Sequence, residues 1–287
     1  LAAPFTFAGG GYPGVGGTCS TTLANGSTCS VVVNFSPASP GLHVDTMDIN
    51  YNNGVSAQTA SRDLQGTASS SALLVISDGP VYDFGPTATG SSKQKSFTVQ
   101  NTGDLVATSM AGLGLAAPFS FAGGSYPGTG GTCVAFLNSL ASCTIVVTYA
   151  PISTGAHADS IQVDYFYCVI NKSACRDVIG TGAQPAIIDI SGAPLVDFGG
   201  IAVGGNAAQI LTVTNNGGVV ATAMAGGGLA APFSFKGGSY PGAGGNCGAS
   251  LSASASCTIE ISFAPSTTGL HADSIQIDYD NGVSAQS

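Results

Sequence analysis

The chain has 287 residues, of which only 7% are Asp, Glu, Lys or Arg, and its 6 basic and 15 acidic residues give a net charge of −9. Soluble globular proteins carry about 25% charged residues, so this surface must be polar but nearly uncharged. The acidic balance, without any Lys/Arg cluster, argues against nucleic acid as a partner. No apolar run approaches the ~20 residues of a membrane helix, and no signal-peptide pattern opens the chain. We therefore expect no membrane insertion in this segment, and any targeting signal or anchor to lie outside it.

The dominant feature of the sequence is an internal repeat. Leu-Ala-Ala-Pro-Phe occurs at Leu1, Leu115 and Leu229, a spacing of 114 residues, and small-residue linkers lie at 68–72 and 183–186. The repeat predicts three domains, which we call the first, second and third copy. They are the C-terminal part of a truncated module at 1–67, a complete module at 73–182, and a module truncated near its C-terminal end at 187–287. We expect the chain to be a window on a longer array.

Taken in chain order, the segments within each copy alternate apolar and polar residues, which is typical of β-strands with one buried face. Asn53-Gly54 predicts a hairpin turn in the first copy, residues 96–100 and 161–165 predict strands in the second, and residues 274–278 predict a strand in the third. Turn signals recur about every ten residues and no segment keeps helical spacing. This pattern predicts an all-β fold, with seven to nine strands in each sandwich.

Five sequence blocks follow one another along the second copy: Asp83-Phe84-Gly85, Phe97 to Gly103, Ala117-Pro118-Phe119-Ser120, Cys143 to Pro151, and Gly180-Thr181-Gly182. Their order resembles that of the ASH-type immunoglobulin-like repeats, and in bacteria that of the choice-of-anchor D repeats of large secreted and surface proteins. The resemblance covers essentially the whole chain. It implies tandem immunoglobulin-like β-sandwich modules of about 114 residues in a linear array. Such modules serve as spacers, stalks and docking surfaces, so the resemblance specifies fold more than function.

The eight cysteines are expected to form four disulfides. The repeat pairs Cys19 with Cys29, Cys133 with Cys143 and Cys247 with Cys257, and the last hairpin of the second copy adds Cys168 with Cys175. Zinc is the rival interpretation, but this spacing lacks a nearby second Cys or His pair, so we predict no metal. Abundant disulfides predict an oxidising, extracellular or cell-surface location.

Catalytic signatures are weak throughout the chain. Asp83-Phe84-Gly85 and Asp197-Phe198-Gly199 imitate the magnesium-binding triplet of protein kinases, but no nucleotide loop, paired Lys or catalytic Asp accompanies them. The run Gly128-Thr129-Gly130-Gly131 lacks the Lys and the helix of a phosphate cradle, so we interpret it as a flexible loop. We predict that the chain is not an enzyme, has no catalytic residue and needs no cofactor.

Three histidines recur in the repeat, each two residues before an Asp, so that each His and Asp share one face of a strand. The pairs are His43 and Asp45, His157 and Asp159, and His271 and Asp273. The shared face would allow a hydrogen bond between them, and we expect a structural corner or an interface role. Alternatives left open are pH-sensitive packing between modules and a ligand role. Acidic residues near Asp164, Asp278 and Asp280 suggest calcium more weakly, because they lack a dense Asp-x-Asp-x-Asp loop.

Tyr12, Tyr126 and Tyr240 recur in a glycine-rich loop before Pro-Gly. Such rings fold back onto the module's own apolar face, or stack on a sugar or a partner protein.

Our first hypothesis for function is the shaft of an extracellular fibre, filament, stalk or adhesin, with self-association or neighbouring modules as partners. It is compatible with a very long chain or with subunits that exchange strands. The alternatives are a surface module that binds glycans or a surface protein through these loops, and a non-catalytic accessory region of a larger secreted enzyme.

Overall fold

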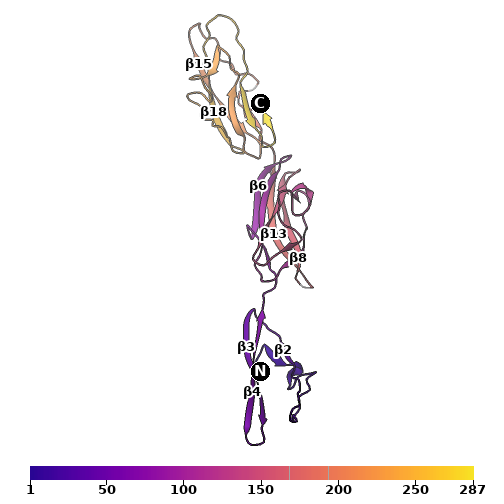
Figure 1. Cartoon of the computed structure of the whole chain (residues 1–287). Coiled ribbons are helices and arrows are strands. Elements are labelled where there is room, and N and C mark those ends of the chain that lie inside the picture. Colours follow the sequence, from indigo (N-terminus) through magenta and orange to yellow (C-terminus); the bar gives the residue numbers. More distant parts are fainter. Residues whose placement is uncertain (168, 193) are drawn as a thin grey trace. The chain divides into compact units, whose positions relative to one another are not determined.

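The computed structural model describes residues 1–167, 169–192 and 194–287. In this part of the chain, twenty strands and two single-turn 3-10 helices form, and there is no α-helix (Figure 1). No helix among the described residues is long and apolar enough to cross a membrane. The contacts divide the chain into two compact units. One holds Leu1–Leu74, Asn101–Ala107 and Asn138–Ala141, and the other holds Val75–Gln100, Thr108–Leu137 and Ser142–Ser287.

The first copy consists of two small antiparallel sheets. Strand β1 (Phe5–Phe7) is followed by η1 (Ala8–Gly10) and pairs with β2 (Val33–Phe35). Strand β3 (Gly41–Asn52) pairs with β4 (Ala57–Ala68) along the full length of a hairpin. The predicted turn between β3 and β4 forms as expected. No further strand pairs with β4 among the described residues.

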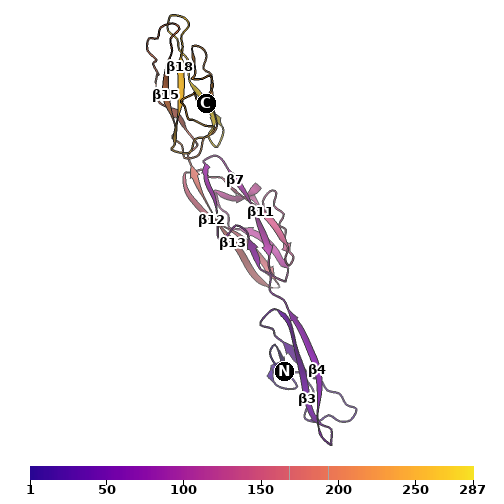
Figure 2. The same ribbon diagram turned by 90° about the vertical axis from the view of Figure 1, so that its left-hand side faces the viewer.

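The second copy contains two sheets. One has the strand order β10-β8-β12-β13-β6 and the other has the order β5-β7-β11-β9. Figure 2 shows β12 and β13 side by side, and β13 also pairs in parallel with β6. The bounds are β5 (Leu74–Ile76), β6 (Val81–Ala88), β7 (Lys93–Asn101), β8 (Ala107–Leu113), β9 (Phe119–Phe121), η2 (Ala122–Gly124), β10 (Phe136–Leu137), β11 (Ser142–Tyr149), β12 (Gly155–Tyr167) and β13 (Ile170–Ala183).

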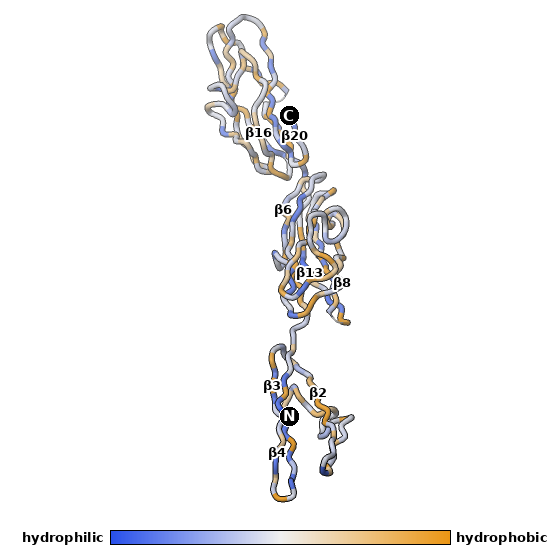
Figure 3. Tube along the Cα trace, viewed as in Figure 1, coloured by the Kyte–Doolittle hydropathy of each residue, from blue (hydrophilic) through white to orange (hydrophobic). Residues whose placement is uncertain are grey.

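The core of the second copy lies between its two sheets. Ile161 and Val178 of one sheet and Tyr149 of the other are completely buried. The Phe84 ring lies 5.5 Å from that of Tyr149 and 5.9 Å from that of Phe119, measured between centroids, so aromatic contacts join the sheets. Figure 3 shows hydrophobic and hydrophilic residues interleaved along the chain, as one-sided burial requires. Two facing sheets of this kind form an immunoglobulin-like β-sandwich.

The third copy has the same kind of core but a less complete set of strands. One sheet has the order β14-β15-β18-β17 and the other has the order β16-β19-β20. The bounds are β14 (Ile188–Ile190), β15 (Ala207–Asn215), β16 (Thr222–Gly227), β17 (Phe233–Phe235), β18 (Ser256–Phe263), β19 (Gln276–Asp280) and β20 (Ala285–Gln286). Within the described part of the chain, β20 pairs with Tyr279 and Asp280 of β19 and with no other strand.

The expected strands at 96–100 and 161–165 lie within β7 and β12. The expected strand at 274–278 begins only at Gln276, because neither β16 nor β20 extends far enough to pair with Ser274 and Ile275. The boundaries of the three copies remain a prediction from the repeat.

A buried asparagine organises one corner of the third copy. The Asn215 side chain is completely buried and donates hydrogen bonds from Nδ2 to the carbonyl oxygens of Val219 and Leu251, at 2.9 and 3.0 Å. Its Oδ1 accepts from the backbone N–H of Ile187 and Gly217, at 3.2 and 2.9 Å. One amide therefore bonds to backbone groups from separate segments and ties them together.

Replacing this amide should be costly. We expect Asn215→Ala to destabilise the chain by about 2–4 kcal/mol, because several buried backbone groups lose their partner at once. The neighbouring Asn216→Ala is the matched control, since residue 216 is exposed, and it should change stability by less than about 0.5 kcal/mol. Urea denaturation measures both variants, and equal effects would contradict this role.

Candidate functional site

Among the described residues three disulfides form, each beside the glycine-rich loop of its copy. They join Cys19 to Cys29, Cys133 to Cys143, and Cys247 to Cys257, with Cα–Cα distances of 4.8, 4.8 and 4.9 Å. These are the three pairs expected from the repeat.

The fourth expected pair is not among these disulfides. Cys175 is free and exposed, and Cys168 lies outside the described residues. Cys175 lies opposite Gln162 in the β12–β13 ladder, five positions from Tyr167 at the hairpin end. The pairing of Cys168 with Cys175 therefore stays a prediction from the sequence.

The glycine-rich loop of the second copy is held against β11 by backbone hydrogen bonds. The Val146 N–H donates to the Pro127 oxygen at 2.8 Å, and the Gly128 N–H donates to the Ser125 oxygen at 2.8 Å. Gly128 has φ +91°, and a Cβ there would lie 2.2 Å from the Val146 oxygen. Because the loop lies so close to β11, only glycine fits this position.

The tyrosines of these loops fold back onto their own copies. The rings of Tyr126 and Tyr240 stand edge-on, 5.6 Å between centroids, to Phe121 and Phe235. Tyr12 makes the same contact with Phe7 at 5.5 Å and is 45% exposed. This packing is the first of the two arrangements expected from the sequence, and no observation favours a sugar platform at these loops.

The three histidines bind the turn that precedes them. His43 Nε2 lies 2.9 Å from the Ser39 oxygen, and His271 Nε2 lies 3.1 Å from the Thr267 oxygen. In the second copy His157 Nε2 lies 3.2 Å from Ser153 Oγ, and its Nδ1 lies 2.9 Å from the hydroxyl of Tyr149. Tyr149 is replaced by phenylalanine in the other two copies, so only the second copy has this hydroxyl contact.

The aspartates bond to other partners, so the hydrogen bond to the histidines that the shared face would allow does not form. Each carboxylate accepts instead from the backbone of the Leu-Ala-Ala-Pro-Phe segment. Asp159 Oδ2 accepts from the Ala116 N–H and Asp273 Oδ2 from the Ala230 N–H, both at 2.7 Å. The hydrogen bond from Ala230, with a second one from Ser274, holds the pKa of Asp273 below its usual range. The strand places His and Asp on one face, but the nearest polar groups differ for the two.

The remaining acidic candidates are also engaged locally. Asp164 accepts from Ser173 Oγ at 2.6 Å, Asp278 from Ser287 Oγ at 2.8 Å, and Asp280 from the Gly282 N–H at 2.7 Å. Among the described residues no three His, Cys, Asp or Glu side chains gather where a metal could bind. In the kinase-like triplet, the Asp83 carboxylate accepts from the Gly85 N–H at 2.7 Å while Phe84 lies in the core. The triplet is therefore a strand and turn.

A charged pair distinguishes the third copy. Lys236 Nζ lies 2.7 Å from Glu260 Oε1, and Glu260 Oε2 accepts from the Gly244 N–H at 2.7 Å. The hydrogen bond from Lys236 is the main reason that the pKa of Glu260 is lowered. The second copy has Ala122 and Val146 at these positions. The glycine-rich loop therefore tolerates either an apolar or an ionic contact with its supporting strand.

Comparisons with known proteins give a distant likeness only. No protein-family model and no curated protein matches the chain. The VesB protease of Vibrio cholerae is 17% identical over 39% of this chain, with a TM-score of 0.31, and the match spans 32% of that protein. The ASH/PapD-like domain of human CEP192 is 16% identical over 40% of this chain and 87% of that domain, with a TM-score of 0.30. The class 5 fimbriae chaperone CfaA is 11% identical over 72% of this chain and 99% of that protein, with a TM-score of 0.26. Scores this low carry no argument, so the fold assignment rests on the sheets themselves.

The loop tyrosine of the second copy gives a testable pH dependence. The hydroxyl of Tyr126 is buried without a partner among the described residues, and burial raises the pKa of Tyr126 to about 12, from an ordinary value of 10.0. Because the pKa is higher in the folded than in the unfolded chain, the contribution of Tyr126 to the free energy of unfolding is fully present below pH 10. That contribution is lost as the pH rises through 12. We expect Tyr126→Phe to keep or raise stability at pH 7, and to show less loss than the natural chain between pH 10 and 12.

Thermal denaturation across this pH range measures the effect. Tyr126→Ala serves as the control for lost packing, and it should destabilise the chain at every pH. A Tyr126→Phe variant that loses stability at alkaline pH as steeply as the natural chain would refute the assignment.

Proposed function

We propose that this chain is a non-catalytic segment of an extracytoplasmic structural protein. Its ASH-type immunoglobulin-like modules of about 114 residues follow one another in a linear array, as the shaft of a fibre, filament, stalk or adhesin. Its partners are its own neighbouring modules or further copies. The three disulfides support this, because such bonds persist in oxidising compartments.

The observation that carries the proposal is the anchoring of both linkers to the copy that follows. In the first linker, the Ser70 backbone N–H and hydroxyl both donate to Asp104 Oδ2 at 2.7 Å, and Ala72 is completely buried. In the second linker, the Gln184 oxygen accepts from the Gly218 N–H at 2.9 Å, and Ala186 is 2% exposed. Linkers held in this way are short spacers instead of free tethers, which is what a shaft requires.

The local disulfides serve the same mechanical purpose. Each closes a loop of ten residues beside the strand that supports it. A cross-link of this length removes about 2.5–3 kcal/mol of chain entropy from the unfolded state, so each copy is reinforced separately. The low charge supports close packing between copies, because few like charges must be brought together.

The first linker can be tested directly. The hydrogen bonds from Ser70 lower the pKa of Asp104 below its ordinary value of 3.8. The contribution of ionised Asp104 to the free energy of unfolding is therefore present above pH 3.8, and it is lost as the pH falls through the lowered pKa. We expect Asp104→Ala to widen the distribution of distances between spin labels placed in the first and second copies. Asp177→Ala, an exposed residue of β13, is the charge-matched control and should leave the distribution unchanged.

The role as a shaft is tested by electron microscopy of the natively isolated protein without reductant. Filaments, or strings of modules with an axial repeat of one or a few sandwich lengths, are expected. Compact particles without such strings would contradict the proposal.

A further inference from the structure

The end of the β12–β13 hairpin departs from the repeat. Residues 165–173 of the second copy read Tyr-Phe-Tyr-Cys-Val-Ile-Asn-Lys-Ser. The counterparts are Tyr-Asn-Asn-Gly-Val-Ser-Ala-Gln-Thr in the first copy and Tyr-Asp-Asn-Gly-Val-Ser-Ala-Gln-Ser in the third. Phe166 therefore stands where the other copies have a polar residue, and Asn171 stands where they have alanine.

The second of these changes completes the acceptor pattern for N-glycosylation. Asn171, Lys172 and Ser173 form the triplet Asn-x-Ser, in which x is not proline. The other two copies keep a hydroxyl at the third position, as Thr59 and Ser287, but have no asparagine at the first. Asn171 is therefore the residue that makes this triplet an acceptor in the second copy.

The side chain of Asn171 is accessible. Asn171 is exposed, and so are Ser173 and Cys175 at the alternate positions that follow it along β13. Ala174, which lies between them, is buried and faces the core. Asn171 therefore projects from the outer face of the sheet. A glycan attached to it displaces no core side chain and leaves the backbone pairing with β12 intact.

An aromatic ring lies opposite this asparagine. Phe166 of β12 pairs with Asn171 in the antiparallel ladder and is 39% exposed. Residues that lie directly opposite on one face of such a ladder have Cβ atoms about 5 Å apart. A sugar on the Asn171 amide therefore lies beside the Phe166 ring, whose apolar face can stack on the C–H side of a pyranose. One change in the hairpin supplies the attachment point and the other supplies the contact.

Two other Asn-x-Ser triplets lie in the first copy. The triplet at 25–27 is in the loop closed by the first disulfide, outside the strands. The triplet at 34–36 begins in β2, where Asn34 pairs with Thr6. Neither asparagine lies opposite an aromatic residue in a ladder that the structure describes. Only Asn171 therefore joins an acceptor triplet to a ring placed to receive the sugar.

We propose that Asn171 is an N-glycosylation site and that Phe166 packs against the first sugar of the glycan. The donor is an oligosaccharide linked to a lipid pyrophosphate, and a membrane-bound transferase makes the transfer outside the cytosol. Nδ2 of Asn171 forms a bond to the anomeric carbon of the sugar and loses a proton, while the bond from that carbon to the pyrophosphate breaks and the lipid pyrophosphate leaves. This site rests on the proposed extracytoplasmic location, because the donor is used there.

The glycan has a role at this hairpin end. Val169 is 91% exposed and Ile170 is 47% exposed, and the sequence places both between Phe166 and Asn171. Exposed apolar residues that lie together favour association with other apolar surfaces. A bulky, hydrated glycan on Asn171 shields them, so the apolar hairpin end is compatible with a soluble, exported chain.

The site is tested by peptide mapping of the natural protein with mass spectrometry, without reductant. We expect the peptide that contains Asn171 to carry the mass of a glycan. In the 287-residue chain secreted from cultured animal cells, Asn171→Gln and Ser173→Ala should each abolish this mass, whereas Ser173→Thr should retain it. Asn138→Gln is the matched control, because Asn138 is exposed but is followed by Ser139 and Leu140 and so begins no acceptor triplet.

The contact with Phe166 is tested by a double-mutant cycle of Phe166→Ala and Asn171→Gln, read as midpoints of thermal unfolding. Loss of the glycan should lower the midpoint of the natural chain and leave that of the Phe166→Ala chain unchanged. This coupling should disappear when the same four chains are produced in cells that lack N-glycosylation.

An unmodified Asn171 in a natural chain whose Cys133 and Cys143 are bridged would overturn the glycan site and leave the extracytoplasmic location standing. An unmodified Asn171 together with free thiols at both cysteines would overturn the location, and the site with it. Equal coupling with and without the glycan would show that Phe166 does not contact the sugar.

Discussion

The sandwich is closed by the approach of its last strand to an aromatic ring. In the second copy β13 passes so close to Tyr149 that only glycine fits at position 180, and the first copy repeats this contact with Gly66 and Phe35. The close approach lets β13 pair on both edges while Val178 enters the core. A side chain at the glycine would push the strand away, and both ladders would be lost with it.

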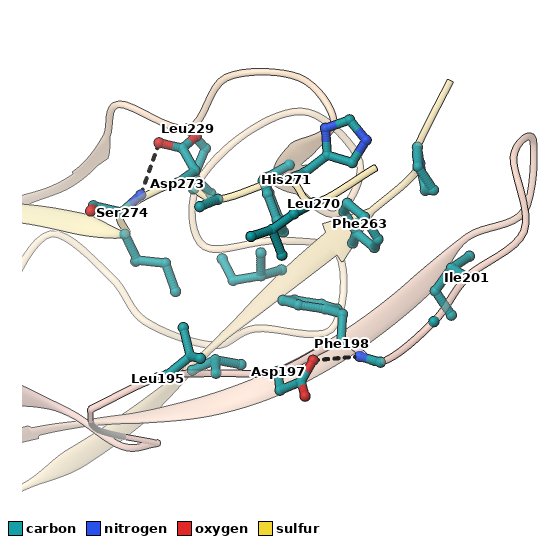
Figure 4. A pocket seen from close by; sticks show the side chains of 18 of the residues that line it. Leu195, Asp197, Phe198, Ile201, Leu229, Phe263, Leu270, His271, Asp273 and Ser274 are labelled. Atoms are coloured by element: carbon teal, nitrogen blue, oxygen red, sulfur yellow. Dashed lines mark hydrogen bonds between the residues drawn. The ribbon is translucent and has the colours of Figure 1, made fainter. Parts of the chain in front are cut away.

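The same constraint explains how the copies differ. In the third copy the ring is Phe263, no strand crosses it among the described residues, and Leu195 and Leu270 are exposed (Figure 4). Positions farther from this contact vary more freely. The pair Lys236 and Glu260 replaces alanine and valine beside the glycine-rich loop, and Tyr149 alone among the three ring positions offers a hydroxyl to a histidine. Variation of this kind changes local contacts without changing the sheets.

Much of the fold could be predicted from the sequence, because alternation and an exact spacing report backbone geometry directly. Strands such as β7 and the three bridged cysteine pairs follow from those patterns. Side-chain partners did not follow. His157 and Asp159 share a face, but each binds a different segment, and that choice depends on where Ala116 and Tyr149 come to lie. The predicted pair of Cys168 and Cys175 stays a prediction, because Cys168 lies outside the described residues.

The central claim, that the last strand closes the sandwich, is tested most directly by hydrogen exchange across the full chain. Residues 155–166 in the second copy and residues 269–280 in the third are counterparts in the repeat. Among the described residues, the first segment pairs along its length with β13, whereas the second pairs with β20 only at Tyr279 and Asp280. The account predicts strong protection of the amides at 155–166 and fast exchange at 269–275 under the same conditions. Equal protection of the two segments would show that the third copy is closed without that strand, and would contradict the account.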